Sequence, residues 1–304
     1  MGTVVHGYFD QAIEPLIRGV SARYQRETQP RRYWASMTWN LVLGGLFLWA
    51  AFGMQGQADR EDCHDWKNSR PPHDVLEACN GLIESHGVDE NDSEGLLSAR
   101  GSAYYRSGDY RRAKRDYLEA VRRDPADSSS QYNLGLVEEQ MGNAGAAMQR
   151  YDAAIHIDGK NADAFKNRGN IYLGNAMYDQ AISDFSAGHE IQPDDPAFLA
   201  LRGLSHAWKR DVSQAERDLS SALKMGPTNV IAMRGKALIA MDRGDAVAAI
   251  PYLSRVLERY PQDDWSLSKR AEAYRRIGAR SKMEGDIATL QNLDSSKIEA
   301  SRDW

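Results

Sequence analysis

A period of 34 residues runs through most of the chain and constrains the fold more than any other feature. A small residue recurs at this interval in six units: Gly101, Gly135, Gly169, Gly203, Ala237 and Ala271. Twelve positions later a second small residue recurs, with Met283 in the last unit: Ala113, Ala147, Ala181, Ala215 and Ala249. Four positions after that come bulky side chains: Tyr117, Tyr151, Phe185, Leu219, Leu253 and Ile287. Such a period predicts a stack of like units.

Each unit predicts two short amphipathic helices joined by a turn, as at Ser107-Gly108-Asp109 and Met141-Gly142-Asn143. Glycine in the turn ends the first helix in a left-handed conformation at little cost. Proline disfavours continuation of the second helix, and the terminator positions hold Pro125, Gly159, Pro193, Pro227 and Pro261. One helix pair cannot bury its apolar face alone, so the pairs are expected to stack.

Residues Glu94–Ile298 resemble an array of tetratricopeptide repeats, as in "RGSAYYRSGDYRRAKRDYLEAVRRDP" and "RGNIYLGNAMYDQAISDFSAGHEIQP". The resemblance implies an all-α fold, a right-handed superhelical α-solenoid of about six helix pairs. The expected units are 94–127, 128–161, 162–195, 196–229, 230–263 and 264–297, with a tail at 298–304. Gly159 departs from the terminal proline and Gly188 from a small Ala. The last unit, with Gly285 in mid-helix, is expected to cap the array.

The resemblance also implies an interaction scaffold, whose first helices line a concave groove for an extended peptide or a partner helix. By the family's register the groove-facing residues are Tyr105, Arg106, Tyr132, Leu136, Lys166, Asn170, Leu173, Leu204, Trp208, Arg234, Leu238 and Arg275. Aromatic and arginine side chains are the usual energetic anchors of interfaces. For Trp208, packing between repeats is an equally good alternative, since Trp is usually mostly buried.

Lys166 and Asn170 in "FKNRGN" resemble the start of the carboxylate clamp that holds chaperone C-termini. That clamp also needs an Asn in the next repeat and a Lys/Arg pair in the one after. The corresponding positions here hold Leu201, Ile231 and Gly235, so chaperone-tail binding is not expected.

Enzyme motifs are missing: the chain has no GxxxxGK[ST], HExxH, GxSxG or CxxC. His156, His189 and His206 are scattered over three repeats, which argues against a catalytic set. The net charge of -5 and the pI of about 5.8 argue against a nucleic-acid binder, because phosphate binding needs a basic face. We therefore expect a non-enzymatic protein without cofactor, metal or small-molecule substrate.

Residues 33–54 form the one long apolar run, 22 residues without a charge. About 20 apolar residues span a bilayer as a helix, and Trp34, Trp39 and Trp49 suit interfacial anchors. The run predicts a single transmembrane helix; the alternative is a buried core helix.

The flanking charges predict the orientation of this span. Before it stand Arg23, Arg26, Arg31 and Arg32, and after it Asp59, Arg60, Glu61 and Asp62. Because basic residues stay on the cytoplasmic side, we expect a cytoplasmic N-terminus and residues 55–304 outside, in the manner of a bacterial inner-membrane protein. Cleavage after Ala58, in Gly56-Gln57-Ala58, is the competing interpretation.

Residues 1–32 have apolar side chains at helical spacing and predict an amphipathic helix on the membrane surface or against a partner helix. A loosely ordered tail is the alternative for so short a segment.

Cys63 and Cys79 are the only cysteines and lie just beyond the predicted span. An oxidising compartment favours a disulfide between them, which would staple a helix from His73 to about Ser85 within an N-terminal cap, 55–93. A zinc site with His64, His73 and His86 is the alternative, although the spacings match no compact zinc pattern.

Three functions remain open from the sequence. The first is a membrane-anchored scaffold that binds proteins outside the cytoplasm. The second is an assembly subunit of a membrane or secretion complex that acts through its transmembrane and N-terminal helices. The third is a soluble periplasmic module released by cleavage.

Overall fold

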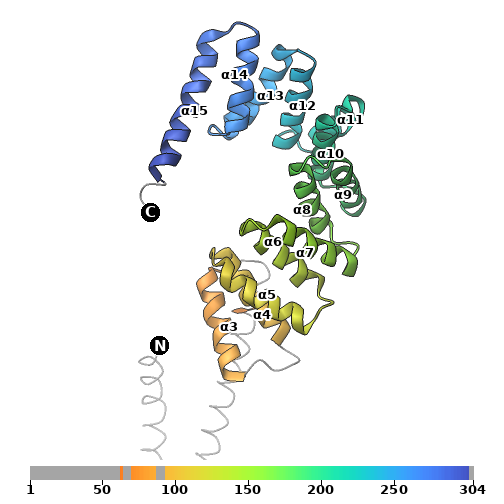
Figure 1. The fold of residues 1–304 in the computed structure, drawn as a ribbon, viewed down its shortest axis with the longest axis vertical. Coiled ribbons are helices and arrows are strands. Elements are labelled where there is room, and N and C mark those ends of the chain that lie inside the picture. The colour runs from red at the N-terminus through yellow and green to blue at the C-terminus, as the bar shows by residue number, and fades with distance from the viewer. Residues whose placement is uncertain (1–61, 64–69, 87–92, 301–304) are drawn as a thin grey trace, which may run out of the picture. The chain divides into compact units, whose positions relative to one another are not determined.

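The computed structural model describes residues 62–63, 70–86 and 93–300, and within these residues it contains thirteen α-helices and no strand (Figure 1). The described residues fall into two compact units, of which the first ends at Gly108 and the second begins at Asp109. The predicted segments 1–32 and 33–54 lie outside the described residues. No helix in the described ranges combines the length and the apolar character that a membrane crossing requires.

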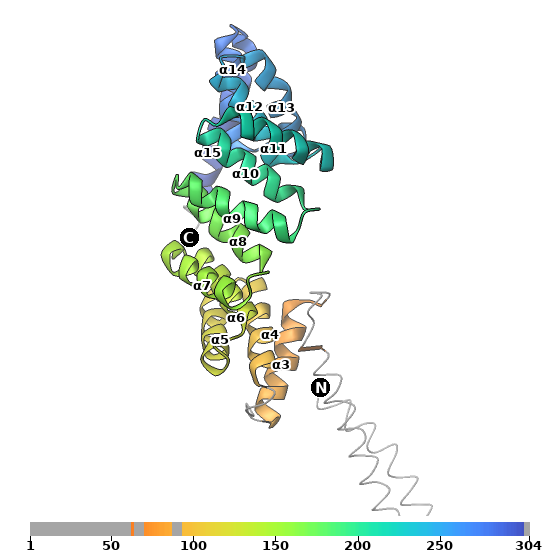
Figure 2. The ribbon, with the colours of Figure 1, turned by 90° about the vertical axis from the view of Figure 1, so that its right-hand side faces the viewer.

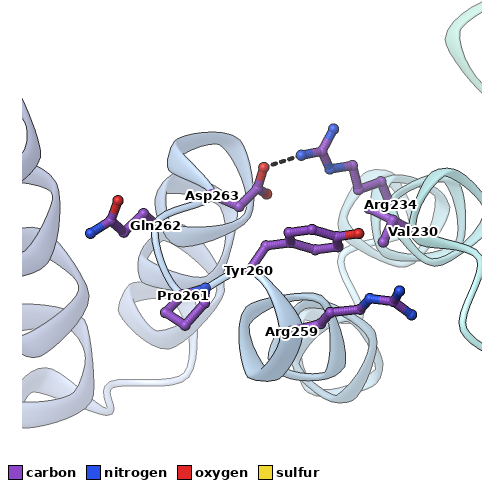
Figure 3. Close-up of a pocket in the computed structure, with 7 residues that line it drawn as sticks. All are labelled: Val230, Arg234, Arg259, Tyr260, Pro261, Gln262 and Asp263. Carbon is purple, nitrogen blue, oxygen red and sulfur yellow. Dashed lines mark hydrogen bonds and ion pairs between the residues drawn. The ribbon is translucent and has the colours of Figure 1, made fainter. Parts of the chain in front are cut away.

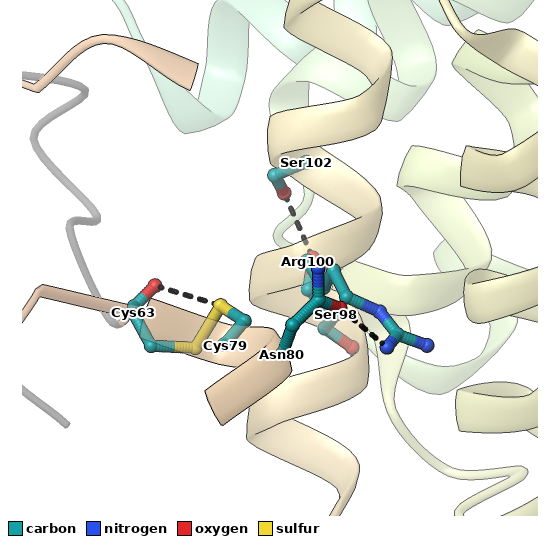
Figure 4. Close-up of a disulfide and its surroundings, with 6 residues drawn as sticks. All are labelled: Cys63, Cys79, Asn80, Ser98, Arg100 and Ser102. Atoms are coloured by element: carbon teal, nitrogen blue, oxygen red, sulfur yellow. Dashed lines mark hydrogen bonds between the residues drawn. A yellow bond between two sulfur atoms is a disulfide. The ribbon is translucent and has the colours of Figure 1, made fainter. Parts of the chain in front are cut away.

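The first unit contains α3 (Pro72–His86) and α4 (Ser93–Arg106), which pack against each other. Cys63 and Cys79 form the expected disulfide, and both residues are buried (Figure 4). The bond ties α3 near its middle to the chain that precedes it. Arg100 Nη1 donates a hydrogen bond to Asn80 Oδ1 at 3.0 Å, which joins α4 to α3.

The second unit begins with one helix, α5 (Tyr110–Arg123), and continues with five helix pairs (Figure 2). The pairs are α6 (Ser128–Gln140) with α7 (Ala144–Ile157), α8 (Ala162–Gly174) with α9 (Tyr178–Ile191), α10 (Pro196–Trp208) with α11 (Val212–Met225), α12 (Val230–Asp242) with α13 (Ala246–Arg259), and α14 (Asp264–Arg276) with α15 (Arg280–Ala300). Consecutive helices of this unit pack on each other, which is the contact pattern of a solenoid. The predicted all-α solenoid is confirmed, and the handedness of its superhelix stays a prediction.

Helix starts in the second unit follow the sequence period. The first helices of the five pairs start at the first residues of the second to sixth expected units: Ser128, Ala162, Pro196, Val230 and Asp264. The residue before each start caps the helix, because its side-chain oxygen accepts a backbone N–H: Asp127, Asn161, Asp195, Asn229 and Asp263.

The second helices end two residues before each predicted terminator, at Arg123, Ile157, Ile191, Met225 and Arg259. Proline disfavours the helical conformation in the residue before it, which explains the early end of the four helices that are followed by a proline. Gly159 stands at the same place as the prolines, and α7 ends at the same distance from it.

The small and bulky residues of the period meet in the core. A Cβ placed on Gly169 would lie 2.7 Å from Cε1 of Phe185, so only glycine lets α8 and α9 approach this closely. Five of the six bulky residues are fully buried: Tyr117, Tyr151, Phe185, Leu219 and Leu253. Ile287 in α15 differs and is 37% exposed, since no described helix follows α15 to cover it.

Candidate protein-binding surface

An arginine ladder holds successive repeats together. Ion pairs join the first helix to the second within a repeat: Arg168 to Asp184 at 2.6 Å, Arg202 to Asp218 at 2.7 Å and Arg270 to Asp286 at 2.7 Å. The same arginines reach the second helix of the preceding repeat, at Asp152 (2.7 Å), Ser186 (3.2 Å) and Ser254 (3.1 Å). Hydrogen bonds to the carboxylates raise the pKa of these three guanidinium groups, which therefore stay charged. These three arginines therefore serve to hold the stacked repeats together.

Two repeats depart from this ladder, since the unit 128–161 has Leu134 and Arg150 at the positions of the arginine and the aspartate. At the positions of the arginine and the aspartate, the unit 230–263 has Lys236 and Tyr252. Lys236 Nζ donates to Ser220 Oγ at 2.7 Å and pairs with Glu216, so it bonds only to the preceding second helix, α11, among the described residues.

The predicted groove residues of α6 and α8 lie at the surface but are partly used by the fold. Tyr132 Oη accepts a hydrogen bond from Asn167 Nδ2 at 3.2 Å, and the Tyr132 ring centroid is 5.8 Å from that of Tyr151. Lys166 pairs with Asp163 at 2.5 Å. Asn170 is exposed, whereas two aliphatic members pack half-buried against the core: Leu136 and Leu173.

The predicted groove residues of α10, α12 and α14 differ in how exposed they are. Trp208, at the last residue of α10, is 42% exposed, and Leu204 one turn earlier is half-buried. Leu238 in α12 is only 6% exposed and packs in a core cluster with Leu199, so it offers no binding surface. Arg275 in α14 is exposed.

Tyr105 and Arg106 belong to the first unit. Tyr105 is half-buried, and Arg106 Nη1 donates to the carbonyl oxygen of Arg70 at 3.1 Å. This bond uses one donor of the guanidinium to hold the end of α4 beside the residues that precede α3.

A hollow of about 650 Å³ opens beside α12 and the turn that leads from α13 to α14 (Figure 3). Its lining consists of Val230, Arg234, Arg259, Tyr260, Pro261, Gln262 and Asp263. Arg234 forms an ion pair with Asp263, and its guanidinium carbon lies 5.5 Å from the ring centroid of Trp265. Arg234 is the one residue of this lining that the sequence predicted to face the groove.

A departure from the period could have pointed to the hollow. Tyr260 follows the last residue of α13, and the matching positions of the earlier units hold small or polar residues: Asp124, Asp158, Gln192 and Gly226. An exposed aromatic residue there, beside Arg259, has no counterpart in those units.

Two groups outside the ladder have pKa values that are shifted chiefly by burial, and they lie in different repeats. Burial, with a hydrogen bond donated to Glu139 Oε2 at 2.8 Å, raises the pKa of Tyr151 above its usual range. Burial lowers the pKa of His206. Across the described ranges, His, Cys, Asp and Glu side chains do not gather in threes as metal ligands do.

Comparison with known proteins finds similar repeats in sequence and similar folds among solved structures. The family model described as tetratricopeptide repeat matches residues 98–162 and 200–264. The DnaJ homolog subfamily C member 3 of Gallus gallus is 28% identical over 190 residues, which cover 58% of this chain and 38% of that protein. The chain thus spans about two fifths of the length of the curated relatives it matches first.

Solved structures share the fold at low sequence identity. PilW, described as a widely conserved type IV pilus biogenesis factor, matches with a TM-score of 0.59 at 18% identity, over 66% of this chain and 94% of that one. A tetratricopeptide repeat protein from Parabacteroides merdae gives 0.57 at 22% identity, over 66% and 80%. YrrB, described as having an unusual peptide-binding site, gives 0.52 at 16% identity, over 64% and 97%.

Proposed function

We propose that this tetratricopeptide repeat protein is a non-enzymatic scaffold that binds a peptide or partner protein along its first helices. One observation carries the proposal: the Arg–Asp ladder builds the frame, while first helices of the same stack keep Trp208, Asn170 and Arg275 at the surface. Exposed aromatic and arginine side chains on a rigid frame are what interface anchors require.

The repeat family supports a binding role, because stacked helix pairs present an extended surface for partners. YrrB has the same fold, and its description names a peptide-binding site. The proposal extends that kind of site to the surface of α6, α8, α10 and α14 in this chain.

Capture of partners by the full-length protein tests this surface. The variant Tyr132→Ala with Trp208→Ala is expected to lose at least about tenfold of the captured partner, because truncating central aromatic anchors typically costs 2 kcal/mol or more. Met225→Ala is the matched control, since Met225 is equally exposed (43%) but lies at the end of a second helix.

Unchanged capture by the double variant, with its helix content and Tm intact, would contradict the proposal. Loss of capture on deletion of residues 1–32, with no loss in the double variant, would favour assembly through the N-terminal segment instead.

The location is the second part of the proposal: a single span at 33–54 holds the repeats outside the cytoplasm. The charge-free run and its basic leading flank support the span. The buried Cys63–Cys79 disulfide supports an oxidising compartment, because cytosolic thiols are normally kept reduced.

Thiol labelling in intact cells tests the location. A membrane-impermeant maleimide is expected to label both cysteines only after reduction and mild denaturation on the outer side. Labelling without reductant, and only after lysis, would place the repeats in the cytoplasm. A mature N-terminus at Asp59 would show instead that the span is cleaved.

A further inference from the structure

The hollow beside α12 brings two arginine side chains and a tyrosine together. Arg259 is exposed and forms no ion pair with any described residue; its guanidinium carbon lies 5.7 Å from the ring centroid of Tyr260. Arg234 lies on the other side of the Tyr260 ring (Figure 3). Two guanidinium groups and a phenol therefore line one opening of about 650 Å³.

We propose that this hollow binds a carboxylate of the partner peptide, an inference that rests on the proposed peptide-binding function. Arginine presents donors in a planar fork that matches the two oxygens of a carboxylate. Arg259 forms no ion pair with any described residue, so its guanidinium group can turn towards a ligand. Tyr260 adds a hydroxyl donor and an aromatic wall for the residue that carries or adjoins the carboxylate.

Arg234 is held in place before any ligand arrives. It is paired with Asp263 and stacked on Trp265. Asp263 is itself fixed, because its Oδ2 accepts the backbone N–H of Ser266 at 2.9 Å and so caps α14. One wall of the hollow is therefore preorganised, which lowers the entropy cost of binding.

The charge of the hollow fits a single negative group. Its lining has two arginines against one aspartate, which leaves one positive charge. An adjoining hollow of about 350 Å³ shares Arg259 and adds Arg255 and Glu258, whose charges cancel. One net positive charge is balanced by a carboxylate and falls short of a dianionic phosphate.

The other repeats act as an internal comparison. At the position of Arg234 the other five units hold Ser98, Tyr132, Lys166, Ala200 and Ser268. At the position of Arg259 they hold Arg123, Ile157, Ile191, Met225 and Leu293. Arg123 is paired with Glu119 at 2.8 Å and so is already satisfied. The unit 230–263 alone among these combines both arginines with the exposed tyrosine, and such departures from a repeat pattern are where function is expected.

Three peptide libraries presented to the immobilised full-length protein test the proposal. The first has a central glutamate and an amidated C-terminus, Ac-XXXEXXX-NH2, with X any residue except Asp and Glu. The second replaces the glutamate by glutamine. The third keeps the glutamine and has a free C-terminal carboxylate. Mass spectrometry of the bound peptides measures the enrichment of each library over the glutamine amide.

Wild-type protein is expected to enrich the first or the third library about tenfold over the glutamine amide, as a charge-assisted hydrogen bond to a carboxylate provides. The first identifies an acidic side chain and the third a chain terminus. Arg259→Ala is expected to abolish the enrichment, and Arg259→Lys to retain part of it. Arg217→Ala removes an exposed arginine from α11 and is the matched control.

Two results would overturn the proposal: equal recovery of all three libraries by wild-type protein, or enrichment that survives in Arg259→Ala. Either leaves the peptide-binding function standing if capture still depends on Tyr132 and Trp208. Failure of that function appears separately, as capture unaffected by the Tyr132→Ala, Trp208→Ala variant. Thermal unfolding of each variant keeps a folding defect from being counted as a binding defect.

Discussion

Individual backbone conformations decide how each first helix turns into its second. Glycine holds the left-handed conformation in four turns: Gly108, Gly142, Gly244 and Gly278. The prediction for Gly108 and Gly142 is thus confirmed. At the equivalent place two repeats have Ala176 and Arg210, with φ of 57° and 65°. A side chain with a Cβ pays roughly 1–2 kcal/mol in this region, so these turns are strained.

We predict that glycine at these two positions relieves the strain. Ala176→Gly and Arg210→Gly should each raise the free energy of unfolding by about 0.5–1 kcal/mol, after the larger unfolded-state entropy of glycine is subtracted. Urea unfolding followed by circular dichroism measures the change. Ala288→Gly, at an exposed helical position in α15, should instead destabilise by about 1 kcal/mol. Equal destabilisation by all three variants would refute the argument.

At the scale of the helices, packing explains why Gly188 stands where the repeat pattern has a small alanine. Its partner is Phe198 in the next repeat, and a Cβ on Gly188 would overlap the Phe198 ring. Neighbouring repeats hold alanine at both matching positions, as at Ala222 and Ala232, both fully buried. The loss of a methyl group in α9 is thus compensated by a large ring from α10.

This compensation predicts coupling between the two positions. Gly188→Ala should destabilise by about 1–3 kcal/mol through overpacking, and Phe198→Ala by about 3–5 kcal/mol through a cavity. The double variant restores the alanine pair of the neighbouring repeat, so its loss should be at least about 1 kcal/mol smaller than the sum. Denaturant unfolding of the four proteins measures this coupling. Additive losses would mean that the ring and the glycine do not share one space.

At the scale of the whole molecule, stability is expected to be local. In a solenoid each repeat contacts only its neighbours, so energy is not shared over the full length. The disulfide lies in the first unit, where it closes a loop with a sequence separation of 16 residues. A loop of this length stabilises by about 3 kcal/mol in the chain-entropy model.

Hydrogen exchange resolves where that stabilisation acts. In the Cys63→Ala, Cys79→Ala variant, amides of α3 should lose protection equivalent to about 3 kcal/mol. Amides of α12 and α14 should exchange as in the wild type. Reduction of the wild-type protein is the control and should give the same pattern. An equal loss of protection in α12 would show that the array unfolds as one cooperative block.

The sequence by itself determined the helix pairs, their starts and ends, the glycine turns and the cysteine pair. Those features depend on residues close together in the chain, and a period of 34 residues reports them directly. The stacking of repeats decided which side chains meet: Gly188 with Phe198, Arg202 with Asp218, and Leu238 with the core. It also brought Arg234 beside Tyr260 and Arg259 in one hollow. Such contacts join residues 10 to 39 positions apart, and a periodic pattern places residues on a face without saying which neighbour they meet there.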